Sequence, residues 1–181
     1  HSSTSFKSVM STKFENMLKS TEKRLEIAML YGNTGIGYAA TQDVGTPTTS
    51  LTFTVSTSQW ATGIWTCSEN ANIVFAKASD NTAVDQLRSF KITGVNPDLR
   101  TVTVAVGTAG TPGTIATLEA AIEAYAGNIF WYGSVSGSAG SFAYAEMAGL
   151  KKIITNTGDL FGINATTYDL WRGNSVTTTG Q

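Results

Sequence analysis

Apolar side chains recur at intervals of three and four residues along the first part of the chain, between residues 5 and 32. Lys, Arg, Glu, Ser and Thr fill most of the other positions, and no proline interrupts the segment. This spacing is that of one face of an α-helix. The apolar set comprises Phe6, Val9, Met10, Phe14, Met17, Leu18, Leu25, Ala28 and Met29. The pattern predicts one long helix that ends at Tyr31-Gly32, because glycine accepts the left-handed dihedral angles that often close a helix.

A helix of this kind is not stable by itself. Roughly 26 residues give a rod of about 39 Å, and ordering the backbone costs about 1 to 2 kcal/mol per residue. Burial of the apolar stripe must offset that cost, either against the rest of the chain, as in an ordinary core helix, or against a neighbouring subunit. We therefore expect Leu18, Leu25 and Met29 to lie in a core or at a subunit interface.

From Leu51 onward the hydrophobic period changes to two, which is typical of strands with one buried face. Short apolar runs at 64–67, 73–76 and 129–132 are further strand candidates. The clearest hairpin pairs 90–95 with 100–106 around Asn96-Pro97-Asp98, whose residue types favour a turn. These segments predict a β-rich module over 38–135, barrel-like or sandwich-like, whereas the turn-rich segment 33–49 is interpreted as a connector.

Helical spacing returns at 114–126 and again at 142–155, where Met147, Leu150, Ile153 and Ile154 form a stripe. The stretch from Gly133 to Ser141 has the composition of a linker. The predicted fold class is therefore α+β, with a long helix and its turn at 1–37, an inserted β-rich module at 38–135, and a helix and loop at 136–181. Leu150 and Ile154 join the candidate interface or core residues.

Composition narrows the possible functions. The 181 residues are 41% hydrophobic and 14% charged, with a formal net charge of -1. Binding to nucleic acid through clustered Lys and Arg is disfavoured, and no apolar run is long enough for a membrane span. His1 begins the sequence without an apolar leader, so we expect no signal peptide and a processed, tagged or incomplete chain.

Candidate chemistry is sparse. His1 is the only histidine and Cys67 the only cysteine, so a Ser-His-Asp site, a thiolate zinc site and an internal disulfide are not expected. Glu119 and Glu123 are one helical turn apart, which is typical of a solvated helix face, and Cys67 is interpreted as a packed thiol in an apolar strand. We expect no enzyme activity, no cofactor and no metal.

The four tryptophans, Trp60, Trp65, Trp131 and Trp171, lie in apolar patterns and are expected in a core or at an interface. Trp171 also stands beside Arg172, and an aromatic anchor next to a guanidinium is common at interfaces. For Trp171, core packing is the first interpretation and an interface contact the second. Both residues are added to the candidate interface or core set.

Two stretches together resemble a known family. They are Glu22-Lys-Arg-Leu-Glu-Ile-Ala-Met-Leu-Tyr-Gly-Asn-Thr-Gly-Ile-Gly37 and the segment that begins Met147-Ala-Gly-Leu-Lys-Lys-Ile-Ile154 and runs to Asn174. The first resembles the end of the spine helix in major capsid proteins of tailed phages, and the second is similar to the stretch leading into their axial domain. These proteins share the Hong Kong 97-type shell fold, and some carry an insertion that resembles the β-rich part here, including Trp60-Ala-Thr-Gly-Ile-Trp65.

The resemblance implies a shell subunit that self-assembles into an icosahedral head enclosing DNA. The implied partners are copies of the chain in hexamers and pentamers, together with portal, scaffold and decoration proteins. The implied location is the virion, with assembly in the host cytoplasm, no membrane and only non-specific contact with packaged DNA. Family members are usually longer, so a fragment is expected. A β-rich adhesive or carbohydrate-binding module is the alternative, and a small hydrolase is a third.

Overall fold

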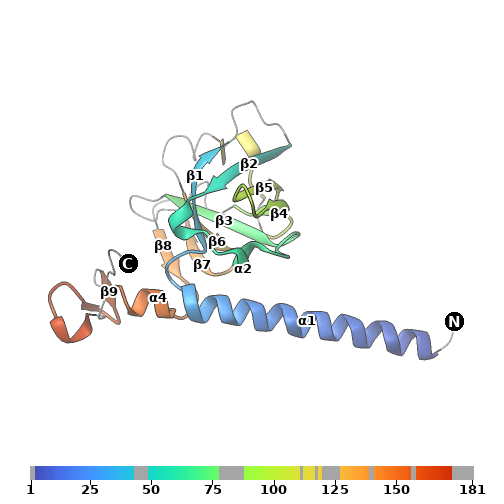
Figure 1. Cartoon of the computed structure of the whole chain (residues 1–181), viewed down its shortest axis with the longest axis horizontal. Helices are drawn as coiled ribbons and strands as arrows, with labels where there is room; N and C mark the ends of the chain where they lie inside the picture. The colour runs from blue at the N-terminus through green and yellow to red at the C-terminus, as the bar shows by residue number, and fades with distance from the viewer. Residues whose placement is uncertain are drawn as a thin grey trace, which may run out of the picture. The chain divides into compact units, whose positions relative to one another are not determined.

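The computed structural model describes residues 3–42, 49–77, 88–110, 112–116, 118–119, 127–138, 141–155 and 158–172 (Figure 1). The chain forms two compact units. The first, here called the helical unit, combines His1–Thr34 with Met147–Gln181, and the second, the barrel unit, is the intervening Gly35–Glu146. The barrel unit is thus inserted, in sequence, between the two parts of the helical unit. Its second boundary follows residue 146 rather than the expected 135.

The helical unit contains one long helix and short elements. Helix α1 spans Ser3–Tyr31, which agrees with the predicted segment of helical spacing. The short elements are α4 (Leu150–Ile153), the strands β9 (Asp159–Leu160) and β10 (Ile163–Asn164), and the 3-10 turn η3 (Asp169–Trp171). Strands β9 and β10 pair antiparallel.

The predicted helix at 142–155 is wrong over most of its length, because only Leu150–Ile153 is helical. Ser141–Tyr144 is a strand, and Gly149 adopts extended dihedral angles of φ -83° and ψ 170° directly before α4. The helical spacing of the apolar residues was therefore not enough to extend the helix through Gly149, because glycine loses more conformational entropy than other residues in a helix interior.

The barrel unit contains six strands that close on themselves in the order β1-β2-β5-β4-β3-β6. Every neighbouring pair is antiparallel. The strands are β1 (Gly37–Gln42), β2 (Ser50–Val55), β3 (Asn72–Lys77), β4 (Phe90–Asn96), β5 (Thr101–Val106) and β6 (Gly127–Trp131). The mixed α+β class is confirmed, and closure leaves no strand of this sheet with an open edge.

Alternation along β2 and β5 places apolar residues inside the barrel, as predicted. Leu51, Phe53 and Val55 are buried, while Thr52 lies between them and its hydroxyl is 2.8 Å from that of Thr103 on β5. Aromatic rings fill much of the interior: Phe75 meets Phe53 and Phe90 edge to face, with ring centroids 5.5 and 5.7 Å apart. Such pairs add to the stabilisation that burial itself provides.

The predicted hairpin is confirmed between β4 and β5. Asn96 pairs with Thr101, and the turn lies between them. The Asn96 side-chain oxygen accepts hydrogen bonds from the backbone amides of Asp98 and Leu99 at 3.1 and 3.2 Å. Asparagine favours turns for this reason, since its side chain replaces a missing backbone partner.

A second hairpin covers the outer side of the barrel. Strands β7 (Val135–Ser138) and β8 (Ser141–Tyr144) pair antiparallel where the sequence composition predicted a linker. Val135 is buried with Val74, Ala76 and Phe130, which point out of the barrel from β3 and β6. The linker prediction was wrong because β3 and β6 are apolar on both faces, and the outer face needs a cover.

Three other local predictions need correction. The connector at 33–49 contains β1, and the predicted strand at 64–67 is instead the short helix α2 (Thr62–Trp65), preceded by the 3-10 turn η1 (Thr57–Gln59). Cys67 is exposed, in a turn with φ 59°, and is not a packed strand residue. Of the predicted helix at 114–126, residues 115, 116, 118 and 119 are helical, and 120–126 lie outside the described residues.

Candidate subunit interface

The apolar stripe of α1 is exposed to solvent along its length. Its large side chains retain between 49% and 70% of their accessible surface: Phe6, Val9, Met10, Phe14, Met17, Leu18, Leu25 and Met29. Among the described side chains of α1, Ile27 is the buried one, and it lies in line with Val9, eighteen residues or about five turns away, at the edge of the stripe. Leu18, Leu25 and Met29 are thus exposed in the structure, and their role in a core or at a subunit interface stays a prediction.

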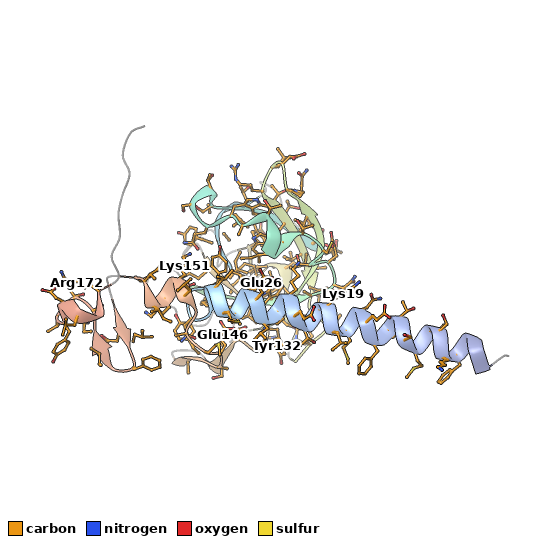
Figure 2. The ribbon with its side chains drawn as sticks, turned by 60° about the horizontal axis from the view of Figure 1, so that its bottom comes forward. Lys19, Glu26, Tyr132, Glu146, Lys151 and Arg172 are labelled. Atoms are coloured by element: carbon orange, nitrogen blue, oxygen red, sulfur yellow. The ribbon has the colours of Figure 1, made fainter. Side chains whose placement is uncertain are left out.

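Polar residues of α1 satisfy their hydrogen bonds within the helix. The hydroxyls of Thr12 and Thr21 donate to the carbonyl oxygens of Ser8 and Met17 at 3.1 and 2.9 Å. A threonine that bonds back to its own helix needs no polar partner from outside. Figure 2 shows side chains projecting from α1 over its whole length, with Lys19 and Glu26 labelled.

The C-terminal end of α1 is joined to the start of α4 by two glycines in direct backbone contact. The Gly149 amide donates to the Gly32 carbonyl at 2.9 Å. A Cβ at Gly32 would overlap the carbonyl oxygen of Met147, and one at Gly149 would lie 2.8 Å from the Leu30 carbonyl carbon. We call this contact the glycine clip; it holds two segments together that are far apart in sequence.

The glycine clip changes the explanation for Gly32. The sequence predicted that Gly32 ends α1 through a left-handed dihedral, but the positive φ values occur at Asn33 (62°) and Gly35 (77°). Glycine stands at position 32 because no side chain fits between the two backbones. Next to the clip, the Lys151 ammonium lies 5.5 Å from the centroid of the Tyr31 ring, a cation–π contact that also links α4 to α1.

The segment around α4 continues the exposed apolar surface of the helical unit. Met147, Leu150, Ile153 and Ile154 are exposed, as are Phe161, Tyr168 and Leu170 further along. Phe161 is 82% exposed and occupies a left-handed conformation (φ 54°) in the two-residue loop between β9 and β10. A bulky residue there is unusual, because such loops favour Asn-Gly.

Arg172 binds within its own segment. Its guanidinium donates to the carbonyl oxygens of Ala165 and Thr166 at 3.0 and 2.7 Å, and lies 3.1 Å from the Asp169 carboxylate. Arg172 therefore closes the loop that follows β10, and its predicted interface role stays a prediction. The Trp171 side chain lies outside the described residues.

Other candidate residues do not gather into a reaction centre. In the described part of the chain, no three His, Cys, Asp or Glu side chains could hold a metal ion together. Glu119 is partly exposed, and Glu123 lies outside the described residues. Trp65 and Trp131 are buried in the barrel unit, and Trp60 stacks on Trp65 at 6.0 Å.

One titratable group of the barrel unit is perturbed. Burial raises the pKa of Tyr144 above its ordinary value, and the nearby Glu146 carboxylate raises it further. The Tyr144 ring lies 6.0 Å from that of Phe130, under the β7–β8 hairpin. Its role is thus to pack that hairpin onto the barrel.

Sequence reasoning found the exposed stripe but missed the glycine clip and Phe161. A glycine that permits close approach looks the same in sequence as one that ends a helix, and its partner Gly149 is remote along the chain. None of the described helices is both long enough and apolar enough to cross a membrane. Comparison of the chain with protein-family models, with curated proteins and with solved structures finds no match.

Proposed function

We propose that this chain is a shell subunit of a tailed bacteriophage: a major capsid protein of the Hong Kong 97-type fold that carries the barrel unit as an insertion. Copies of it assemble into an icosahedral head around DNA, with portal, scaffold and decoration proteins as further partners. It works through contacts between subunits and has no active site. The observation that carries this proposal is the exposed apolar stripe of α1.

The stripe is too extensive to remain in water. Soluble monomers rarely expose continuous apolar patches of more than a few hundred Å², whereas eight large side chains of α1 are about half exposed or more. The partner that covers them contributes the free energy that burial within the chain does not supply. A protein that tiles a shell uses the same patch on every copy, so each stripe finds a cover.

The helical unit also supports the proposal. The two stretches that resemble the capsid family, 22–37 and 147–174, fall mainly in this unit and meet at the glycine clip. The barrel unit has its own core and is inserted between them. An insertion with a separate core adds a module to a shell protein while leaving the shell-forming segments connected.

Assembly tests this function directly. The chain is produced alone and with candidate scaffold proteins, and its mass is followed by light scattering and its shape by electron microscopy. We expect large regular assemblies. Leu18→Asp and Leu25→Asp abolish them, because each puts a charge on the stripe, whereas Lys19→Ala, on the opposite side of the helix, leaves them unchanged.

The fold of each variant is checked by near-ultraviolet circular dichroism of the buried barrel aromatics and by far-ultraviolet circular dichroism of the helix content. If assemblies still form with either aspartate substitution, the stripe takes no part in assembly. Monomers that bind a glycan tightly would support the alternative, a β-rich adhesive or carbohydrate-binding module. Monomers that turn over a small substrate would support an enzyme.

A further inference from the structure

The apolar stripe of α1 follows an eleven-residue repeat. The residues related by this interval are Phe6, Met17 and Ala28; Phe14 and Leu25; and Leu18 and Met29. An eleven-residue repeat corresponds to about 3.67 residues per turn, so residues eleven apart form straight columns along the helix. Adjacent columns make one continuous strip, and a partner helix can follow it with a slight right-handed supercoil.

Two polar residues stand in the columns of the strip: Lys7 begins the column of Leu18 and Met29, at the edge of the strip, and Thr21 lies near its midline. Thr21 stands in the same column as Met10. Its hydroxyl is already bonded to the Met17 carbonyl at 2.9 Å, so burial would leave no unsatisfied donor. The strip therefore runs from the first turns of α1 to Met29.

Charged residues follow the same repeat on the two flanks of the strip. Glu15 and Glu26 are eleven residues apart on one flank, with Glu22 beside them, and Lys13 and Arg24 are eleven apart on the other. At about 98° per residue, the acidic flank lies about 80 to 115° to one side of the midline and the basic flank about 80° to the other. Between residues 13 and 26, one side of the strip is thus acidic and the other basic, whereas Lys7 lies on the acidic side nearer the start of the helix.

This charge arrangement distinguishes the two ways of pairing α1 with another α1. In a parallel pair related by a twofold axis, each flank lies against the opposite flank of the partner, so acidic meets basic on both sides. In an antiparallel pair each flank meets its own kind, and like charges repel. The flanks therefore select a parallel partner with the same sequence.

We propose that α1 packs in parallel and in register against α1 of a second copy of this chain. The inference rests on the proposed function in taking the cover to be another subunit, and it specifies which surface that subunit supplies. The exposed apolar surface is large, because eight side chains of the stripe are about half exposed or more on each helix, and a standard specific interface buries roughly 800 Å² per partner. The polar, locally satisfied residues on the opposite side of α1 stay in water.

Cysteine cross-linking tests the direction of pairing. Cys67 is the only cysteine and is exposed, so Cys67→Ser supplies a background without thiols. Met10→Cys and Thr21→Cys are made separately in it, both near the midline of the strip. In a parallel, in-register pair each position meets itself, within disulfide reach. Each variant should form a covalent dimer under mild oxidation, about tenfold faster than the surface control Lys19→Cys.

A mixture of the two cysteine variants gives the opposite result if the helices are antiparallel. Position 10 then meets position 21, and the mixed dimer exceeds both self-linked dimers. That outcome, or cross-linking no faster than in the control, would overturn the proposal. If electron microscopy shows particles but no self-linked dimers form, the proposed shell function stands and the α1–α1 contact is not part of it.

The charged flanks are tested by reversal. Glu15→Lys with Glu26→Lys reverses two of the three charges on the acidic flank and should weaken self-association about tenfold, because the reversed positions then face like charges. Adding Lys13→Glu and Arg24→Glu to the same chain restores opposite flanks and should restore association. Failure of the second pair to restore it would show that the flanks do not meet, provided that circular dichroism reports the same helix content in all variants.

Discussion

A methyl group at Gly149 should separate α1 from α4. Gly149 has φ -83° and ψ 170°, values that alanine adopts without strain, so Gly149→Ala tests close approach and nothing else. The new Cβ would lie 2.8 Å from the Leu30 carbonyl carbon and 2.8 Å from the Tyr31 amide nitrogen. Both are backbone atoms of α1 and cannot rotate away as a side chain would.

The expected cost has two parts. Overpacking a tight contact costs about 1 to 3 kcal/mol, and displacement of the Gly149 amide from the Gly32 carbonyl removes a hydrogen bond worth about 0.5 to 1.5 kcal/mol. Together the glycine clip should lose about 2 to 4 kcal/mol. Since about 1.4 kcal/mol changes an equilibrium constant tenfold, the population of the open state should rise roughly 30-fold or more.

Hydrogen exchange followed by mass spectrometry measures this opening. Amides from 147 to 155 should exchange at least about 30-fold faster in Gly149→Ala, while the buried strands of the barrel keep their protection. Gly63→Ala is the matched control, because a Cβ at Gly63 meets no atom within 4 Å; we expect it to be neutral or stabilising by up to about 1 kcal/mol. Unchanged exchange at 147–155 would refute the close approach of the two backbones.

Three further predictions concern separate features. Phe161→Asn should stabilise the β9–β10 loop by about 0.5 to 1 kcal/mol, because Asn suits the left-handed position before Gly162. The same change should weaken assembly, measured by light scattering. A loss of loop stability together with a loss of assembly would contradict an exposed contact role for Phe161. Because the pKa of Tyr144 is raised in the folded protein, the unfolded protein loses this proton at a lower pH than the folded protein does. The free energy of unfolding should therefore fall above pH 10.0, the ordinary pKa. Phenolate absorbance should show a late-titrating group that Tyr144→Phe removes. Phe75→Ala should lower the free energy of unfolding, measured in urea, by about 3 to 5 kcal/mol. A smaller decrease would mean that the barrel core collapses around the cavity.

Long periodic segments were predictable from the sequence. The spacing along α1 extends over many turns, and the hairpin around Asn96 combines alternation with a turn-forming sequence, so local and tertiary preferences agree. Short apolar runs were not predictable in the same way. Ile64 and Trp65 lie in a run too short for periodicity to separate a strand from a buried helical turn, and packing of Trp65 in the barrel decided for the helix.

The candidate interface was only partly predictable. Spacing identified Leu18 and Leu25 as members of an apolar face, but it does not tell whether that face is covered by the same chain or by another. Both residues are exposed in the structure. The sequence carries no signal for the glycine clip, since the steric need for Gly32 arises from a backbone segment more than a hundred residues away along the chain.

Closure of the barrel through β1 and β6 also sets the order of events during synthesis. Gly37 pairs with Ile129, so the barrel cannot close until about ninety further residues have left the ribosome, which takes roughly 5 to 20 s at ordinary translation rates. The residues of α1 emerge before any of this. Polysomes bring several nascent copies of the same sequence close together, so the proposed pairing of α1 with α1 can begin before the barrel is complete. If α1 pairs with α1 of a second copy as proposed, the first contact between two subunits is expected while both are still attached to ribosomes.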